Sequence, residues 1–84
     1  MSPETIFDLI VCCTREVVPE LDGHVFLRED RLADLGANSI DRAEIAAMVL
    51  ESLSLDVPRT QLFGPHDIGG LADLLFELHA APVQ

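Results

Sequence analysis

The chain has 84 residues, 49% of them hydrophobic, and it carries 15 acidic against five basic side chains, for a formal net charge of −10. So short a chain forms one domain with a modest core, and its hydrophobic content excludes a disordered polypeptide. The acidic balance excludes nucleic acid and anionic membranes as partners, because both require clustered Lys and Arg. We therefore expect a single domain over residues 1–84 that binds basic protein surfaces, although the excess acid could merely aid solubility.

The cysteine and histidine content indicates neither disulfides nor metal. Cys12 and Cys13 are adjacent, so a bond between them would be badly strained, and they indicate a reducing compartment. The three histidines are far apart in sequence, and no metal-ligand spacing occurs. Since no targeting segment or membrane-spanning run is found either, we expect a cytoplasmic protein.

A first helix is predicted over residues 2–18. Ser2, Pro3 and Glu4 supply a capping hydroxyl, a proline for the first helical position and an acid near the positive helix end. Pro19 ends the helix. Apolar residues at helical spacing form its core stripe: Ile6, Leu9, Ile10, Cys13 and Val17.

A long connection over residues 19–38 follows, and we interpret it as an ordered crossing loop. Gly23 and Gly36 interrupt it, and a short helical turn is expected over residues 31–35. Its apolar residues are expected to pin it to the core: Leu21, Val25, Phe26, Leu27, Leu32 and Leu35.

The second half of the chain predicts three further helices, over residues 39–53, 59–63 and 68–79. Asn38 caps the first of them, with Asp41 in the reciprocal position of a capping box, and Asp67 caps the last. Gly69 and Gly70 each cost that last helix up to about 1 kcal/mol relative to Ala, so they either permit close packing or are merely tolerated. The predicted fold is all-α, a four-helix bundle with a long first loop and a short third helix.

Ser39 is the candidate functional residue. Gly36 permits a tight turn, Asn38 caps the helix, and Ser39 begins it with its hydroxyl directed outward. A phosphate ester at this position would meet free backbone N–H groups and the positive end of the helix dipole. The site therefore suits a phosphorylated serine, although most serines at helix starts have no role beyond the cap.

The helix that begins at Ser39 has two distinct faces. Its core stripe consists of Ile45, Ala46, Val49, Leu50 and Leu53. The opposite face carries Ile40, Glu44, Ala47 and Glu51, with Met48 at its edge. This mixture of apolar and acidic residues beside Ser39 predicts a docking strip for a basic partner, the alternative being an ordinary solvated face.

The segment Asp-Leu-Gly-Ala-Asn-Ser-Ile-Asp, residues 34–41, resembles the phosphopantetheine attachment motif of acyl carrier proteins, and the resemblance extends over essentially the whole chain. It implies that a phosphopantetheinyl transferase attaches 4'-phosphopantetheine from coenzyme A to Ser39. The thiol of that arm then holds acyl groups, supplied by an acyl-loading enzyme, as thioesters. Asp41 and Glu44 match acidic positions of the family's recognition helix. The resemblance thus implies a carrier, expected to be monomeric, and not an enzyme.

Asn38 departs from the motif, which usually has Asp there. With Arg42, it makes the chain similar to polyketide carriers, and in particular to the donor carriers of β-branching cassettes. Those deliver an acetyl or related acyl group to a hydroxymethylglutaryl-synthase-like enzyme. Acceptor carriers tend to have Trp six residues after the serine, where this chain has Ile45. The docking residues expected on this basis are Ile40, Asp41, Arg42, Glu44, Ala47, Met48 and Glu51.

Three alternatives are weighed against this interpretation. A generic fatty-acid or polyketide extension carrier would serve a ketosynthase, and an unmodified helical adaptor would use the docking strip alone. An enzyme with Ser39 as nucleophile is disfavoured, because Asp41 breaks a G-x-S-x-G pattern, no strand precedes the serine and no histidine lies near it in sequence. The start at Met1 and the short tail after the last helix favour a free-standing protein, the alternative being a domain excised from a larger synthase.

Overall fold

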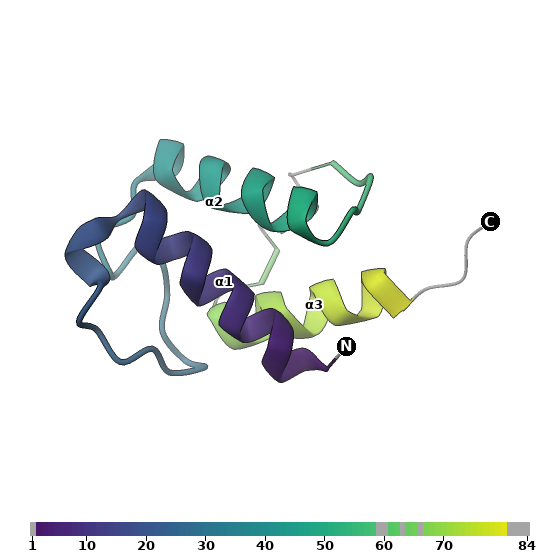
Figure 1. Cartoon of the computed structure of the whole chain (residues 1–84), viewed down its shortest axis with the longest axis horizontal. Coiled ribbons are helices and arrows are strands. Elements are labelled where there is room, and N and C mark those ends of the chain that lie inside the picture. The colour runs from purple at the N-terminus through teal and green to yellow at the C-terminus, as the bar shows by residue number, and fades with distance from the viewer. Residues whose placement is uncertain (1, 59–60, 63, 66, 81–84) are drawn as a thin grey trace.

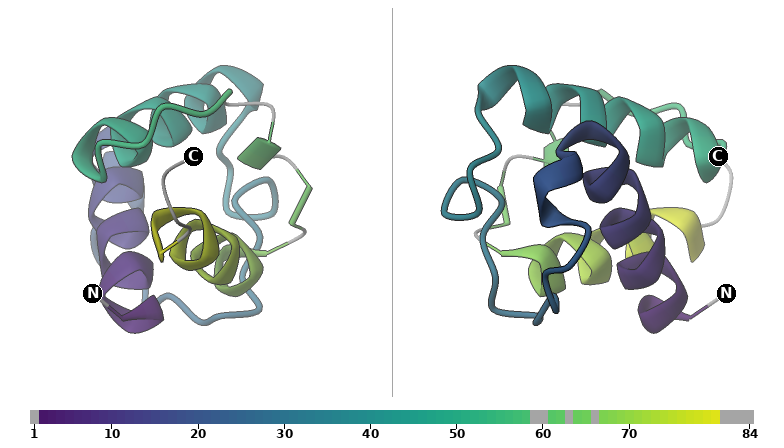
Figure 2. Two further views of the ribbon diagram at one scale, coloured as in Figure 1. Left: turned by 90° about the vertical axis from the view of Figure 1, so that its right-hand side faces the viewer. Right: turned by 60° about the vertical axis from the view of Figure 1, so that its left-hand side comes forward.

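The computed structural model describes residues 2–58, 61–62, 64–65 and 67–80. These residues form three α-helices, α1 (Pro3–Val17), α2 (Ser39–Ser52) and α3 (Ile68–Ala80), and a 3-10 turn, η1 (Pro19–Leu21). The helix α1 packs against both α2 and α3 (Figures 1 and 2). The all-helical prediction is thus confirmed for this part of the chain, in which no helix has the length and apolarity needed to cross a bilayer.

The predicted count of four helices is wrong for the described residues, which contain three. Three of the five positions of the expected helix over residues 59–63 lie outside the described part of the chain. Within the remainder, the Gln61 N–H donates to the Pro58 carbonyl at 3.1 Å, and Gln61 and Leu62 form one 3-10 turn. Pro58 and Pro65 limit the length of a helix here, because proline lacks an N–H and restricts the residue before it.

The predicted capping groups of α2 and α3 are confirmed. Asn38 Oδ1 accepts a hydrogen bond from the Asp41 N–H at 2.8 Å, and Asp41 Oδ2 accepts one from the Asn38 N–H at 3.3 Å, which completes the capping box. At the start of α3, Asp67 Oδ1 accepts from the Gly70 N–H at 2.7 Å. Both helix starts are therefore determined by side chains next to them in sequence.

The core lies where the three helices meet. The stripe predicted for α2 is buried in full, whereas Leu9 and Val17 of the α1 stripe are only half-buried. Thr14 is instead fully buried, and its Oγ1 donates to the Ile10 carbonyl at 2.7 Å, which satisfies the hydroxyl inside the core. The main buried cluster consists of Ile6, Ile10, Cys13, Ile45, Ala46, Val49, Leu50, Leu53, Leu62, Ile68, Leu71, Ala72 and Leu75.

The crossing loop is anchored by fewer apolar residues than predicted. Phe26, Leu32 and Leu35 pack against the core as expected. The prediction is wrong for Val25 and Leu27, which are 77% and 52% exposed. Because successive side chains of an extended segment point to opposite sides, turning Phe26 inward turns both neighbours outward.

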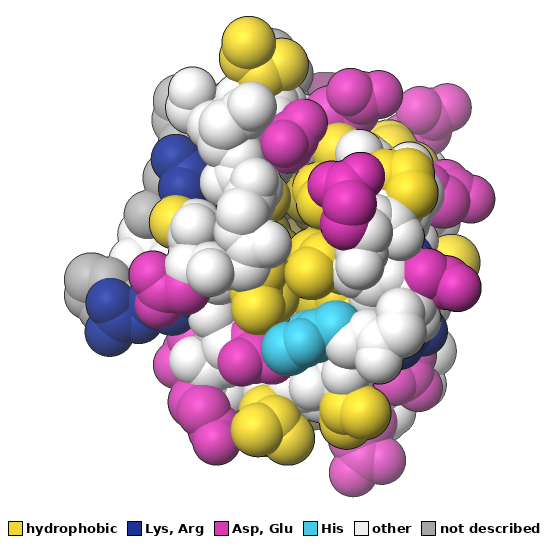
Figure 3. Space-filling view, turned by 90° about the vertical axis from the view of Figure 1, so that its left-hand side faces the viewer, with side chains coloured by type: hydrophobic (Ala, Val, Ile, Leu, Met, Phe, Trp, Pro, Cys, Tyr) yellow, Lys and Arg dark blue, Asp and Glu magenta, His cyan; other side chains and the backbone are white. Residues whose placement is uncertain are grey.

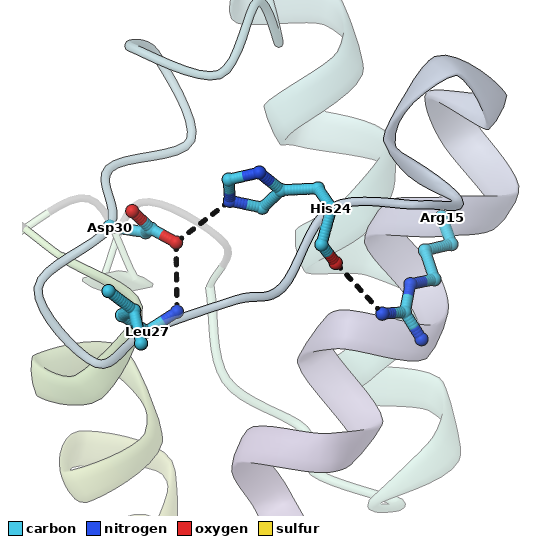
Figure 4. Close-up of polar contacts among 4 residues, drawn as sticks. All are labelled: Arg15, His24, Leu27 and Asp30. Carbon is cyan, nitrogen blue, oxygen red and sulfur yellow. Dashed lines mark hydrogen bonds and ion pairs between the residues drawn. The ribbon is translucent and has the colours of Figure 1, made fainter.

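Polar contacts hold this loop against α1 (Figure 4). Arg15 Nη2 donates to the His24 carbonyl at 3.0 Å, and the guanidinium lies 5.3 Å from the centre of the Phe26 ring. Asp30 Oδ2 lies 3.0 Å from His24 Nε2 and accepts a hydrogen bond from the Leu27 N–H at 2.8 Å. The Asp30 carboxylate therefore closes the turn that follows Phe26.

These contacts predict an acid-dependent contribution of Asp30 to stability. The pKa of its carboxyl lies below the ordinary value of 3.8, first because the Leu27 N–H donates to it and second because of the His24 hydrogen bond. A lowered pKa in the folded state adds stability above the unfolded pKa, and that contribution is lost as the pH falls through the folded pKa. Asp30→Asn should therefore differ most from the wild type near neutral pH and progressively less below about pH 4.

Urea midpoints measured between about pH 7 and pH 3 check this expectation. Glu29→Gln is a matched control, since it removes a neighbouring exposed carboxylate that accepts no hydrogen bond from the described residues. The control reports the change of net charge alone. A constant difference between Asp30→Asn and the wild type across this range would contradict the assigned role.

The loop also joins the start of α3 directly. The Gly69 N–H donates to the Arg28 carbonyl at 2.8 Å, and the Ile68 N–H donates to the Asp30 carbonyl at 2.9 Å. Arg28 Nη2 reaches Asp73 Oδ2 at 2.7 Å. A Cβ atom on Gly69 would lie 2.8 Å from Arg28 Cβ and 3.0 Å from its carbonyl oxygen. Close packing, one of the two alternatives that the sequence left open, therefore explains Gly69.

Gly69→Ala is expected to destabilise the protein by about 1–3 kcal/mol, because the steric cost of overpacking exceeds the gain of up to about 1 kcal/mol in helix propensity. Gly23→Ala is the control, because a Cβ there meets nothing within 4 Å, and its free energy of unfolding should change by less than about 0.5 kcal/mol. Thermal and urea unfolding measure both. Equal stabilities of the two variants would contradict the close packing.

Candidate functional site

Ser39 is the first residue of α2, and its side chain is exposed. The turn before it is closed by the Ala37 N–H, which donates to the Leu32 carbonyl at 3.1 Å. Gly36 adopts φ +98° in this turn, a conformation that favours glycine, and the buried Ala37 anchors the chain next to the core. Because Asn38 provides the cap, the Ser39 hydroxyl is left available for covalent chemistry.

A hollow of about 540 Å³ opens beside Ser39. The loop over residues 31–34 forms one wall, the first turns of α2 a second, and the start of α3 with the segment before it a third. Its lining combines apolar side chains with two arginines and two aspartates: Arg31, Leu32, Ala33, Asp34, Ser39, Arg42, Ala46, Leu62, Pro65, Asp67, Ile68 and Leu71. The hollow thus brings the loop before Ser39 and the first turns of α2 next to Leu62, Pro65 and the start of α3, which are remote from them in sequence.

The structure brings four predicted docking residues onto one exposed face of α2. Ile40 is 75% exposed, Glu44 and Glu51 are exposed, and Ala47 lies half-buried between them. Their spacing of four, three and four positions places them in one row along the helix. We call this row the docking strip: Ile40, Glu44, Ala47 and Glu51.

The three other predicted docking residues lie elsewhere. Asp41 is half-buried and is engaged in the capping box, and Met48 packs partly against the core. Arg42 is half-buried and lines the hollow, on the core-facing side of α2 together with Ala46. Arg42 is therefore directed toward the surroundings of Ser39 and not along the docking strip.

Arg31 is the residue of this site that the sequence analysis missed. It lies in the helical turn before Ser39, where the Leu35 N–H donates to the Arg31 carbonyl at 3.1 Å, and it is one of the residues that line the hollow. The available indication was a basic residue, rare in this acidic chain, shortly before the candidate serine. A basic residue at this position does not by itself predict a role at the site, because the hollow forms only when α3 packs against the loop.

The described residues that line the hollow beside Ser39 include two aspartates but no histidine, and His24 is engaged with Asp30. Figure 3 shows a histidine side chain next to acidic and apolar side chains on the face drawn there. No group of three His, Cys, Asp or Glu side chains suited to a metal ion occurs within the described ranges. Ser39 is exposed, and the hollow beside it has both charged and apolar walls. This combination suits a group attached covalently to the serine that has a polar and an apolar part.

Comparisons with known proteins agree with this geometry. Residues 13–75 match the family described as phosphopantetheine attachment site. The chain is 52% identical over 77 residues to the polyketide biosynthesis acyl-carrier-protein AcpK of Bacillus subtilis (strain 168), covering 92% of this chain and 94% of that protein. It also matches a chain in the crystal structure of the curacin biosynthetic pathway HMG synthase in complex with acetyl donor-ACP. That match has a TM-score of 0.86 and 47% identity, and covers 89% of this chain and 96% of the other.

Members of this family are carriers and not enzymes, and they hold a covalently attached 4'-phosphopantetheine. When bound, that group supplies the thiol on which acyl groups are carried as thioesters. The family match spans all of α2 and most of α3, and includes Ser39. The chain therefore belongs to the phosphopantetheine-bearing acyl carrier proteins of polyketide biosynthesis.

Proposed function

We propose that this protein is a donor carrier, which holds an acetyl group on a phosphopantetheine arm at Ser39 and delivers it to a hydroxymethylglutaryl-synthase-like enzyme for β-branching. The observation that carries this proposal is the 47% identity, at a TM-score of 0.86, to a chain crystallised in a complex of an HMG synthase with acetyl donor-ACP. The alternative is a generic extension carrier that serves a ketosynthase, and an experiment must distinguish this role from the donor role.

The environment of Ser39 supports its role as the attachment residue. Ser39 is exposed, its hydroxyl is not needed for the helix cap, and the residue lines the hollow. The first N–H groups of α2 and its positive helix end favour a negatively charged substituent there. The protein's residues thus provide an accessible nucleophile for the transferase and a favourable electrostatic environment for the product.

The donor role is further supported by residues near Ser39. Ile45, at the position where acceptor carriers tend to have Trp, is 1% exposed and belongs to the core. The docking strip presents apolar Ile40 beside Ser39 and the acids Glu44 and Glu51 further along α2, an arrangement suited to a partner with a basic rim. The transferase, the acyl-loading enzyme, the monomeric state and the cytoplasmic location belong to the same proposal.

Competition between acetyl-loaded carriers for one hydroxymethylglutaryl synthase tests the donor role. This protein and a fatty-acid synthase carrier, both acetyl-loaded, are mixed with the enzyme, and acetyl transfer to its cysteine is followed by mass spectrometry. Preferential transfer from this protein is expected, by about tenfold or more, because specificity is a difference between two binding energies. Equal transfer from both carriers would remove the donor role and leave the generic carrier.

Arg42→Glu should reduce the preference of the synthase for this carrier by about tenfold and slow the modification of Ser39 by less, since a single charge can shift specificity by that amount. Arg42 lines the hollow beside Ser39, so its reversal changes what the synthase meets around the arm. The measurement is the same competition, performed with the variant. A transferase defect larger than the loss of preference would contradict this role of Arg42.

A further inference from the structure

The arginines of this acidic chain fall into two groups by their contacts. The chain has five basic residues, all arginine, and the structure describes the side chains of four. Arg15 and Arg28 hold the crossing loop, through the His24 carbonyl at 3.0 Å and the Asp73 carboxylate at 2.7 Å. Their positive charges thus contribute to the fold.

Arg31 and Arg42 have no such structural role. Neither forms an ion pair or a side-chain hydrogen bond with the described residues. Both line the hollow that Ser39 also lines, Arg31 from the loop and Arg42 from the first turns of α2. Two arginines that form no ion pair with the described residues therefore line one hollow of a chain whose formal net charge is −10.

The aspartates of the hollow do not account for these arginines. Asp67 lines the hollow, but its Oδ1 accepts the Gly70 N–H at 2.7 Å as the cap of α3. Asp34 lines it without forming an ion pair to either arginine. The uncommitted guanidinium groups therefore remain available for an anion at the mouth of the hollow.

We propose that Arg31 and Arg42 form an arginine clamp that binds the phosphodiester of the carrier's own arm. This inference rests on the proposed attachment at Ser39. The phosphate would be bonded directly to Ser39 Oγ, so it stays beside the hollow whatever the rest of the arm does. Guanidinium donors match phosphate oxygens in geometry and charge, and their hydrogen bonds to anions are stronger than those between neutral groups.

The clamp would determine the direction in which the arm leaves Ser39. Elsewhere, the strongly acidic surface repels a phosphodiester, whereas the clamp attracts it toward the gap between α2 and the start of α3. The arm therefore begins over the hollow and away from the docking strip, which is left free for a partner. A partner enzyme that binds the phosphate through its own cations must compete with Arg31 and Arg42.

NMR of the arginine side chains tests the clamp on the wild-type protein, before and after loading with coenzyme A and a transferase. The Nε–Hε signals of Arg31 and Arg42 should shift on loading, and those of Arg15 and Arg28 should stay in place. The latter two are controls within the same molecule. Shifts of all four signals alike, or of none, would overturn the clamp.

A thermodynamic cycle provides the second measurement. Apo and holo forms of the wild type and of Arg31→Gln/Arg42→Gln are unfolded in urea, so that arm attachment is one change and loss of the arginines the other. General effects of the substitutions on folding cancel between the apo and holo forms. The coupling should be roughly three- to tenfold in the unfolding equilibrium constant at low salt, as for exposed ion pairs, and should fall at high salt. Arg31→Lys/Arg42→Lys should retain part of it.

Intact mass separates failure of the clamp from failure of the proposed function. If the wild type gains no phosphopantetheine mass, or gains it elsewhere than at Ser39, the attachment proposal fails and the clamp fails with it. If Ser39 is loaded but the cycle shows no coupling, the clamp alone is overturned. A loaded Ser39 with a salt-sensitive coupling supports both.

Discussion

Ser39→Ala is expected to abolish attachment of phosphopantetheine completely and to leave the protein folded. The substitution removes the only hydroxyl that the described residues contribute to the lining of the hollow. It leaves the start of α2 intact, because Asn38 and Asp41 form the capping box. Since the side chain is exposed, the free energy of unfolding should change by less than about 0.5 kcal/mol. Intact mass after incubation with coenzyme A and a transferase measures the first effect, and thermal unfolding by circular dichroism the second.

Ser52→Ala is the matched control for this experiment. Ser52 is also exposed and also in α2, but it is the last residue of that helix. The Ser52→Ala protein should gain the same mass as the wild type at the same rate. Any modification of the Ser39→Ala protein would show that the attachment residue has been assigned wrongly.

Reversal of both acids of the docking strip, Glu44→Lys with Glu51→Lys, should slow acyl transfer to partner enzymes by roughly ten- to a hundredfold at low salt. The long-range attraction between the acidic strip and a basic partner accelerates their encounter, and like charges would replace it by repulsion. Because both side chains are exposed, stability should change by less than about 1 kcal/mol. Stopped-flow transfer rates across a salt series measure the effect, which should fade as salt screens the charges.

Asp8→Lys with Glu77→Lys is the control for net charge. These two acids are exposed on α1 and α3, away from the docking strip, and their reversal changes the net charge equally. Transfer should slow much less in this variant, since only the overall field is changed. Equal slowing by the two double variants would show that the total charge matters and that the strip has no specific role.

Much of the site was predictable because it depends on neighbours in sequence. The cap of α2 involves Asn38 and Asp41, three residues apart, and the turn before it requires Gly36 at φ +98°. Such contacts span a single turn of chain, so the residue types alone indicate them. The core stripe of α2 was equally accessible, since the helical period sorts buried from exposed positions. The carrier family followed from the same segment, residues 34–41.

Features that join distant segments required the tertiary structure. The close packing of Gly69 depends on Arg28, 41 positions earlier, and the exposure of Val25 depends on which way the extended loop turns Phe26. The hollow beside Ser39 forms from the crossing loop, α2 and the start of α3, so Arg31 could not be assigned to it from its neighbours. The chemistry proposed for Ser39 thus rests on the residues around it in sequence. Its surroundings were determined by packing, because no local pattern specifies which remote surfaces meet.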